Sequence, residues 1–240
     1  MRVAIFCKTY PADYEWLDYM LRSVEKYAKG FSDMVVVSPD LDWMDEGGRE
    51  PRYWTGRINL TALKRDEHNP GYLWQQCCKV SADVWTAPSF IMYIDSDCVL
   101  DREFHASELF RDGKPMLLRR TWEEAGEAIC WRKPTEDALG IHTKYETMCC
   151  HPLIYHRETL QRFRRRIQQM HGVDANQYIL NQPSFSEFNA LGNHALNFEP
   201  QSYAIIDCGP DDGYPRPIRQ AYSWGGLTPQ VRAEWERICA

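Results

Sequence analysis

Residues 90–100 read Phe-Ile-Met-Tyr-Ile-Asp-Ser-Asp-Cys-Val-Leu, an apolar run that leads directly into two carboxylates spaced Asp-x-Asp. The run from Phe90 to Ile94 has the length and the aromatic and β-branched content of a buried strand, and Pro88 marks where a preceding helix must have ended. We therefore expect Asp95 and Asp97 at the C-terminal end of a buried strand.

Two carboxylates at the end of a buried strand need a positive partner, because they repel each other and lose their hydration. Mg²⁺ or Mn²⁺ suits this role, since either ion takes one or two protein carboxylates and completes its shell with water and substrate phosphates. An isolated Asp-x-Asp can also be only a turn with an Asx cap. The buried strand in front favours a metal held by Asp95 and Asp97.

A helix is predicted just before this strand, from Tyr72 to Val84. Lys79 lies one helical turn from Gln75 and Gln76, so all three are expected on one face. An isolated helix lysine is usually only a solvated charge. The residues around this one favour a role in a site.

The two segments together resemble the Gly-aromatic-x-x-Gln-Gln-x-x-Lys and Asp-x-Asp pattern of small GT-A type glycosyltransferases, and the resemblance extends loosely from Val3 to about Gly192. It implies an α/β, Rossmann-like GT-A fold and a nucleotide-sugar donor, with a UDP-sugar expected. It also implies that Asp95 and Asp97 hold Mn²⁺ or Mg²⁺ on the donor diphosphate. The helix with Gln75, Gln76 and Lys79 would lie against that donor.

The chain is predicted to form one domain over residues 1–240, with a donor half (1–110) and an α+β acceptor half (111–240). Strands alternate with helices in the first half, which predicts a mainly parallel sheet with ligands at the strands' C-terminal ends. The expected elements there are a strand over 3–7, a helix over 14–29 ended by Gly30, a strand over 33–37 and a long loop over 42–66.

The acceptor half is predicted to contain strands over 115–119 and 149–155, a helix over 157–170 and a segment over 177–180 ended by Pro183. The tail over 209–226 is rich in Gly, Pro, Arg and Tyr and is not expected to pack as a regular element. In the resembled family, C-terminal loops of this kind fold over the donor.

Basic and polar residues outside the helix are further candidates for donor binding. The first strand is followed by Lys8, Thr9 and Tyr10, where the resembled enzymes contact the nucleotide, although a polar turn explains these residues equally well. Arg216 and Arg219 in the tail could clamp a diphosphate or only keep a loop soluble.

Transfer of a sugar also needs a group near the acceptor hydroxyl. Glu187 is the candidate general base, because its flanking residues Phe185 and Phe188 could raise its pKa and the resembled family has a Ser-Glu-aromatic motif here. It could also be a helix N-terminal glutamate with Ser184 or Ser186 as the cap, or bind acceptor hydroxyls. A retaining mechanism would need no base.

A third metal ligand is predicted at His194, with Asp207 as the alternative, although a lone histidine is more often a cap or a surface residue. Structural zinc at Cys149, Cys150 and His151 is disfavoured, because the chain contains neither Cys-x-x-Cys nor His-x-x-x-His.

Composition fits a soluble globular enzyme. The hydrophobic fraction is 44%, and no apolar run approaches the roughly 20 residues that span a bilayer. The apolar stretch at the N-terminus is too short for a signal peptide, so the nine cysteines are expected to be reduced thiols in a cytoplasmic protein.

The net charge of −6 disfavours general nucleic-acid binding. One predicted helix nevertheless carries several arginines, which could track a phosphate backbone, an anionic glycan or a membrane surface, or only present solvated charge; they are Arg157, Arg162, Arg164, Arg165 and Arg166. The acceptor could therefore be a saccharide, another hydroxyl compound or a hydroxylated base in modified phage-type DNA.

Three functions fit these residues. The leading one is a metal-dependent glycosyltransferase. A nucleotidyltransferase would also use paired aspartates, but no glycine-rich phosphate loop precedes them here. A non-catalytic nucleotide-sugar-binding module would not need the acids together with Lys79 and Glu187.

Overall fold

The computed structural model describes residues 1–39 and 71–240 with their side chains and residues 57–62 as backbone. Its helices are α1 (Tyr14–Tyr27), α3 (Gly71–Val80), α4 (Arg132–Leu139), α5 (Arg157–His171), α6 (Ala175–Leu180), α7 (Glu187–Phe198) and α8 (Pro229–Cys239). Its strands in the first half are β1 (Val3–Lys8), β2 (Ala28–Lys29), β3 (Asp33–Ser38), β4 (Arg57–Ala62), β5 (Phe90–Tyr93), β6 (Cys98–Leu100) and β7 (Phe104–His105). The later strands are β8 (Phe110–Arg111), β9 (Lys114–Thr121), β10 (Tyr145–Glu146), β11 (Leu153–His156), β12 (Ala204–Asp207) and β13 (Ile218–Gln220).

The central sheet has the strand order β11-β5-β1-β3-β4. β1 runs parallel to β5 and β3, and β4 runs parallel to β3, whereas β11 is antiparallel to β5. The predicted α/β architecture with a mainly parallel sheet is thus confirmed. Because β1 and β5 are parallel, the Lys8 end of β1 and the Asp95 turn after β5 lie at the same edge of the sheet.

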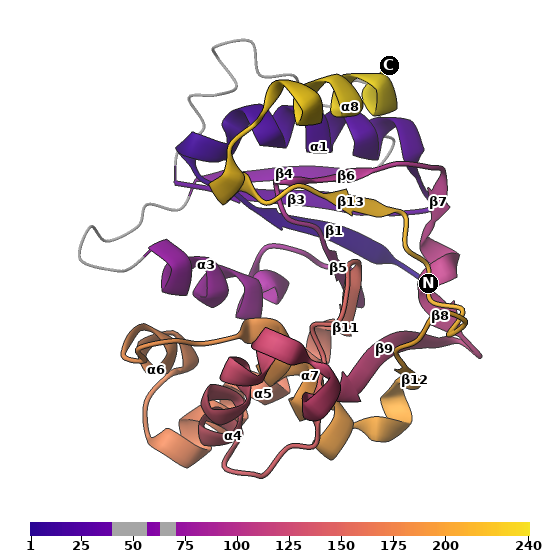
Figure 1. The fold of residues 1–240 in the computed structure, drawn as a ribbon. Helices are drawn as coiled ribbons and strands as arrows, with labels where there is room; N and C mark the ends of the chain where they lie inside the picture. Colours follow the sequence, from indigo (N-terminus) through magenta and orange to yellow (C-terminus); the bar gives the residue numbers. More distant parts are fainter. Residues whose placement is uncertain (40–56, 63–70) are drawn as a thin grey trace.

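Both faces of the sheet are covered by helices, with α1 and α8 on one side and α3 with α5 to α7 on the other (Figure 1). Alternate residues of each strand enter different cores. In β5, Ile91 and Tyr93 pack on the α3 side with Phe188 of α7, while Met92 packs on the α1 side with Leu17. The core on the α3 side of the sheet therefore contains residues from both halves of the chain.

The second half adds a smaller sheet in which β9 lies between β10 and β12, with β8 also paired to β9. None of the described helices is long and apolar enough to span a membrane.

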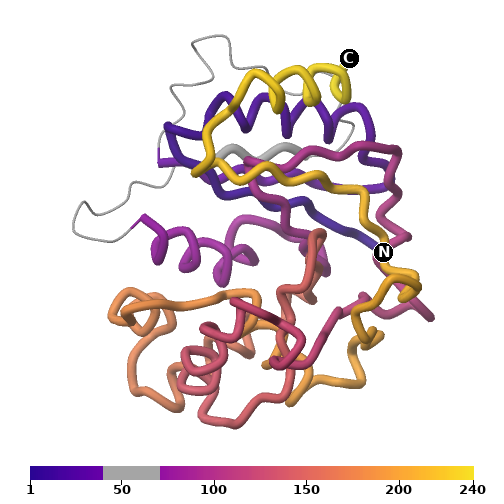
Figure 2. The backbone as a smooth tube through the Cα atoms, in the orientation of Figure 1, coloured from indigo at the N-terminus to yellow at the C-terminus, as the bar shows by residue number. Residues whose placement is uncertain are grey.

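The tail differs from the prediction, because residues 218–220 form β13, which pairs antiparallel with β6. Beyond it, α8 packs on α1, where the ring of Trp235 lies 4.8 Å from that of Trp16 and 5.7 Å from that of Tyr19. The chain thus returns to its N-terminal layer (Figure 2). A three-residue strand is too short to show a periodicity in the sequence. Residues 218–220 become a strand because the edge of β6 is free to pair with them.

Several predicted boundaries were also wrong. Helix α1 ends at Tyr27, and residues 28–29, predicted as its end, form β2. Helix α3 ends at Val80 and is followed by a separate 3₁₀ turn at Ala82–Val84. The strand predicted over 149–155 begins only at Leu153, after a proline that has no N–H to donate to a ladder. The predicted loop over 42–66 contains β4, and its residues 42–56 and 63–66 lie outside the described part of the chain.

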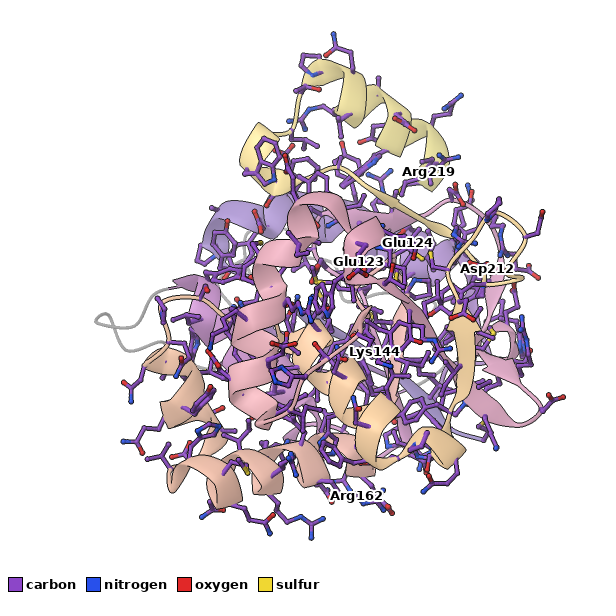
Figure 3. The ribbon with its side chains drawn as sticks, turned by 60° about the horizontal axis from the view of Figure 1, so that its bottom comes forward. Glu123, Glu124, Lys144, Arg162, Asp212 and Arg219 are labelled. Atoms are coloured by element: carbon purple, nitrogen blue, oxygen red, sulfur yellow. The ribbon has the colours of Figure 1, made fainter. Side chains whose placement is uncertain are left out.

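Most arginines of α5 fasten neighbouring elements. Arg157 donates to the carbonyls of Asp83 and Thr86, Arg164 bonds Val80 O and the Asp83 carboxylate, and Arg166 donates to Leu139 O at the end of α4. Arg162, in the helical layer away from the tail residue Arg219 (Figure 3), pairs with Glu199 at 2.9 Å. The arginine pattern is therefore largely structural, and an anionic partner is not needed to explain it.

Candidate active site

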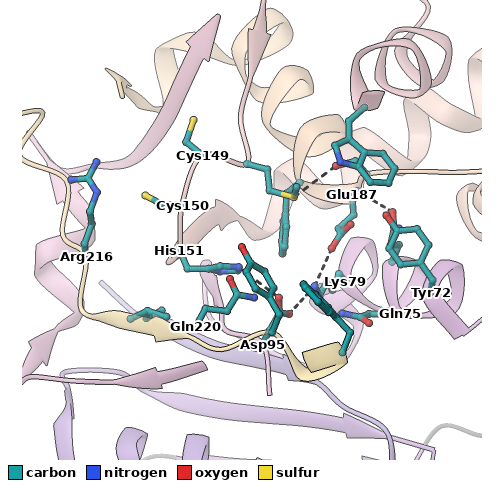
Figure 4. Close-up of a pocket in the computed structure, with 18 residues that line it drawn as sticks. Tyr72, Gln75, Lys79, Asp95, Cys149, Cys150, His151, Glu187, Arg216 and Gln220 are labelled. Atoms are coloured by element: carbon teal, nitrogen blue, oxygen red, sulfur yellow. Dashed lines mark hydrogen bonds and ion pairs between the residues drawn. The ribbon is translucent and has the colours of Figure 1, made fainter. Parts of the chain in front are cut away.

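A pocket of about 680 Å³ lies beside the turn that follows β5 (Figure 4). One face of α3, the start of α7, the segment 148–151 and the tail enclose it. The lining residues are Tyr72, Gln75, Gln76, Lys79, Asp95, Trp131, Met148, Cys149, Cys150, His151, Ser186, Glu187, Phe188, Arg216, Ile218, Gln220, Tyr222 and Trp224.

Lys79 is the centre of this pocket. Its ammonium lies 2.8 Å from Asp95 Oδ1 and 3.0 Å from Glu187 Oε1, and 4.7 Å above the ring of Phe188. The side chain is only 4% exposed. Burial lowers the pKa of Lys79, but Asp95 and Glu187 together outweigh burial and raise the pKa above its ordinary value. One buried cation therefore joins two carboxylates from distant parts of the sequence.

Asp95 stays ionised because it lies next to the positive charge of Lys79. Burial alone would raise the pKa of Asp95, but the Lys79 ammonium and, to a smaller extent, His151 bring the pKa below its ordinary value.

Helix α3 is fastened to the start of α7 by side chains on its pocket face. The Tyr72 hydroxyl donates to Phe185 O at 2.7 Å, and Gln76 Oε1 accepts from the Glu187 N–H at 3.1 Å. The helical spacing that predicted a shared face thus brings Gln75, Gln76 and Lys79 into one pocket with Asp95 and Glu187.

Asp97 points toward the tail and does not line the pocket. The Ser223 N–H donates to its Oδ2 at 2.9 Å, and Gln220 Nε2 donates to its Oδ1 at 3.3 Å. Burial, followed by repulsion from Asp95, raises the pKa of Asp97 above its ordinary value. The second acid of the motif is therefore buried and short of positive charge.

His151 is a pocket residue that the sequence did not predict for the donor site. Its Nε2 lies 3.6 Å from Asp95 Oδ2, too far for a hydrogen bond, and its ring packs edge-on against Phe188. Burial lowers the pKa of His151 more than Asp95 raises it, so the pKa lies below its ordinary value. His151 lies in a segment that is neither helix nor strand. The sequence around it therefore has no periodicity that could have indicated which way its side chain points.

The predicted donor-binding residues at the end of β1 and just after it lie outside the pocket lining. Lys8 is buried, its ammonium contacts Thr9 O, and burial lowers the pKa of Lys8. Thr9 is buried, while Tyr10 is half exposed beside Asp13. Their proposed contacts with a donor remain predictions.

The two tail arginines differ from each other. Arg216 lines the pocket but is paired with Asp212 at 2.6 Å. Arg219 pairs with Asp101 at 2.6 Å and does not line the pocket, because Ile218 and Gln220 on either side of it in β13 face the pocket instead.

The predicted third metal ligands lie elsewhere. His194 is buried outside the pocket with its Nε2 3.1 Å from Glu199 Oε1, and Asp207 is an exposed residue paired with Arg119. Across residues 1–39 and 71–240, no three His, Cys, Asp or Glu side chains gather into a group that could hold a metal. The structure therefore does not bring His194 or Asp207 to the acids, and it gives no zinc cluster at Cys149 and Cys150.

The acids nevertheless fit a divalent cation that takes its remaining ligands from substrate and water. The Lys79 ammonium contacts Asp95 and Glu187, whereas Asp97 accepts hydrogen bonds from uncharged groups, the Ser223 N–H and the Gln220 amide. Burial and, after it, repulsion from Asp95 raise the pKa of Asp97, and a cation beside both aspartates would offset both effects.

The family model described as "Family of unknown function (DUF6492)" matches residues 4–195. The chain belongs to this family, and the match covers β1 through most of α7, including every element that carries Lys79, Asp95 and Glu187. No curated protein matches the chain.

Proposed function

We propose that this protein is a GT-A type glycosyltransferase that uses a divalent cation and a nucleotide-sugar donor, with a UDP-sugar as the expected donor. The observation that carries the proposal is the pair of ion pairs made by Lys79. They hold Asp95 and Glu187 together in one pocket beside Asp97. The parallel sheet supports it, because ligands of such sheets bind beyond the strands' carboxyl ends.

Asp95 and Asp97 would hold Mn²⁺ or Mg²⁺. When bound, the ion would offset the negative charge of the donor diphosphate as it leaves. Lys79 keeps Asp95 ionised and in position. To bind the ion, Asp97 would give up its hydrogen bonds with Ser223 and Gln220 of the tail. Donor binding would therefore be coupled to the position of the tail.

Glu187 would act on the acceptor. Its Oε1 contacts Lys79, and the carboxylate faces the pocket (Figure 4). In the proposed reaction the acceptor oxygen bonds to the anomeric carbon, the bond from that carbon to the diphosphate oxygen breaks, and Glu187 takes the hydroxyl proton. Such a direct displacement inverts the anomeric centre.

A reducing compartment fits the cysteines, all nine of which are free thiols. We propose the cytoplasm as the location.

The test is a thermal-shift panel of nucleotide sugars with and without Mn²⁺, because a ligand that binds only the folded state raises Tm. We expect a nucleotide sugar to raise Tm only with Mn²⁺, and Asp97→Asn to lose this response. Asp207→Asn is the matched control, since this exposed aspartate lies outside the pocket. No response from any nucleotide sugar, or an unchanged response in Asp97→Asn, would overturn the proposal.

A transfer assay then tests the chemistry. Glu187→Gln keeps the shape of the side chain but cannot accept the proton, so we expect the rate to fall by roughly 10²–10⁴ with donor binding retained. Normal turnover would instead indicate a retaining enzyme in which Glu187 binds the acceptor. A response to nucleoside triphosphates alone would identify a nucleotidyltransferase, and donor binding without any product would identify a binding module.

A further inference from the structure

We infer that Tyr72 and Trp131 form a stacking platform for a sugar ring, and that the acceptor of this protein is a saccharide. Naming the ligand as an acceptor rests on the proposed glycosyl transfer. The platform itself rests on the pocket.

The two rings stack on each other at the pocket wall. Their centroids are 6.2 Å apart and their planes differ by 29°, so each ring supports the orientation of the other. Tyr72 is 51% exposed although it is held by the hydrogen bond from its hydroxyl to Phe185 O. A large aromatic side chain that is fixed and still open to solvent at a pocket is typical of a binding surface.

Polar groups that could meet hydroxyls lie next to this face. Glu187 and Gln75 line the same pocket, and Gln76 is fully buried with its Oε1 engaged by the Glu187 N–H. Gln76 Nε2 makes no well-formed hydrogen bond, although a buried amide normally does. Gln75 and Glu187 are therefore the polar groups that could meet the hydroxyls of a ligand at this edge.

A pyranose ring has the matching chemistry, with a face of C–H groups and a rim of hydroxyls. The C–H face can stack on the electron-rich aromatic face, which leaves the rim free to bond amide and carboxylate groups at the edge. Nucleobases also stack on aromatic rings. A nucleic-acid acceptor, however, would bring its phosphates to a site already rich in carboxylates, on a chain of net charge −6.

A second aromatic pair in the pocket belongs to the opposite wall. Tyr222 and Trp224 stack at 5.9 Å in the tail, and Ser223 between them donates to Asp97. This pair is therefore attached to the Asp-x-Asp side, whereas Tyr72 and Trp131 are attached to the Glu187 side. The arrangement assigns Tyr222 and Trp224 to the donor, and Tyr72 and Trp131 to the acceptor.

The test is saturation-transfer NMR with the full chain and three kinds of probe: methyl glycosides of glucose, galactose and mannose, the disaccharides maltose and cellobiose, and 5-hydroxymethyl-2′-deoxyuridine. We expect at least one saccharide to bind, and Trp131→Ala and Tyr72→Leu each to weaken that binding by about tenfold or more. Phe198→Ala is the control, because it removes a partly exposed aromatic side chain that does not line the pocket. Tyr72→Phe, which keeps the ring, should bind nearly as well as the wild type.

The inference is overturned if no saccharide binds, if Trp131→Ala and Tyr72→Leu bind like the wild type, or if only the nucleoside uses the platform. A thermal-shift measurement of nucleotide sugars with Mn²⁺ on the same samples separates the two claims. Donor binding without saccharide binding removes only the saccharide platform. Platform-dependent saccharide binding without any donor binding leaves a sugar-binding site and removes the glycosyltransferase proposal.

Discussion

At the scale of single residues, the electrostatics of the pocket depend on one ammonium. Lys79 is nearly inaccessible to solvent, and it bridges Asp95 and Glu187, which come from different halves of the chain. A buried ion pair contributes little when compared with apolar residues of the same volume, but removal of one partner leaves an uncompensated charge. Lys79 therefore positions two proposed functional acids and is also needed for their burial.

Lys79→Met is expected to lower the free energy of unfolding by about 3–5 kcal/mol at pH 7, because two buried carboxylates lose their counter-ion. The deficit should shrink as the pH falls from 7 toward about 4, where carboxylates protonate. The wild type should instead lose stability at low pH. The lowered pKa of Asp95 stabilises the folded state, and this contribution is lost as the pH falls through that pKa. Denaturant unfolding between pH 4 and 7 measures the deficit of the variant, and unfolding of the wild type below pH 4 measures the loss at Asp95. The control is Lys144→Met, at an exposed position (Figure 3), and a deficit that stays constant with pH would contradict the assignment.

Asp97→Asn is expected to stabilise the ligand-free protein at pH 7. The pKa of Asp97 is raised in the folded state, so the wild type loses stability as the pH rises from the ordinary toward the folded pKa. The amide carries no charge and its oxygen can still accept from the Ser223 N–H. Each kcal/mol gained raises Tm by about 2–4 °C for a chain of this length. Tm without divalent ions at pH 4 and pH 7 tests this, and a variant that is less stable than Asp207→Asn at pH 7 would argue against unbalanced charge at Asp97.

At the scale of elements, helix α7 carries the proposed base and packs very closely on the segment before β11. A Cβ added at Gly192 would lie only 2.5 Å from Thr147 Cβ, which is closer than real contacts allow. Thr147 cannot move away easily, because it is fully buried and its N–H donates to Asn189 of the same helix. The position of Glu187 thus depends on a glycine one and a half turns further along the helix.

Gly192→Ala is therefore expected to destabilise the protein by about 1–3 kcal/mol. This outcome is diagnostic because alanine in a helix interior is normally better than glycine by about 1 kcal/mol. Unfolding in urea gives the comparison with Gly209→Ala, where nothing lies within 4 Å of an added Cβ. Equal stability of the two variants would show that α7 has room to shift.

At the scale of the whole molecule, the last part of the chain closes the pocket and is anchored on the first. Helix α8 rests on α1, where Trp235 is 1% exposed and Glu236 pairs with Arg22 at 2.8 Å. The tail segment that lines the pocket lies between this anchor and β13. The two ends of the sequence therefore jointly fix the position of Tyr222 and Trp224.

Trp235→Ala is expected to cost about 3–5 kcal/mol, as large aromatic truncations in a core do. Before global unfolding, amide hydrogen exchange over residues 218–228 should become faster, because the anchor that restrains this segment is weakened. Trp224→Ala, at an 87% exposed position, should change stability by no more than about 0.5 kcal/mol. Unchanged exchange over 218–228 in Trp235→Ala would show that β13 alone holds the tail.

The sequence by itself predicted the features that depend on local periodicity. The strands at Val3 and Phe90, the amphipathic helices and the shared face of Gln75, Gln76 and Lys79 follow from spacings of two and of three to four residues. The turn that contains Asp95 and Asp97 was predicted because an apolar strand is followed directly by these two charged residues. These elements also contain Asp95 and Lys79, which were predicted separately as a metal ligand and a donor-binding residue and which the structure brings into contact.

Only the tertiary structure decided which distant groups meet. Nothing near Lys79 in the sequence specifies Glu187 as its second partner, and nothing near Asp97 specifies the Ser223 N–H. His151 faces Asp95 from a segment without regular structure, and the arginines of α5 meet carbonyls at the ends of other elements. Such contacts come from the packing of whole layers, in which each buried charge or carbonyl finds whichever partner the fold brings within reach, so local patterns along the chain could not determine them.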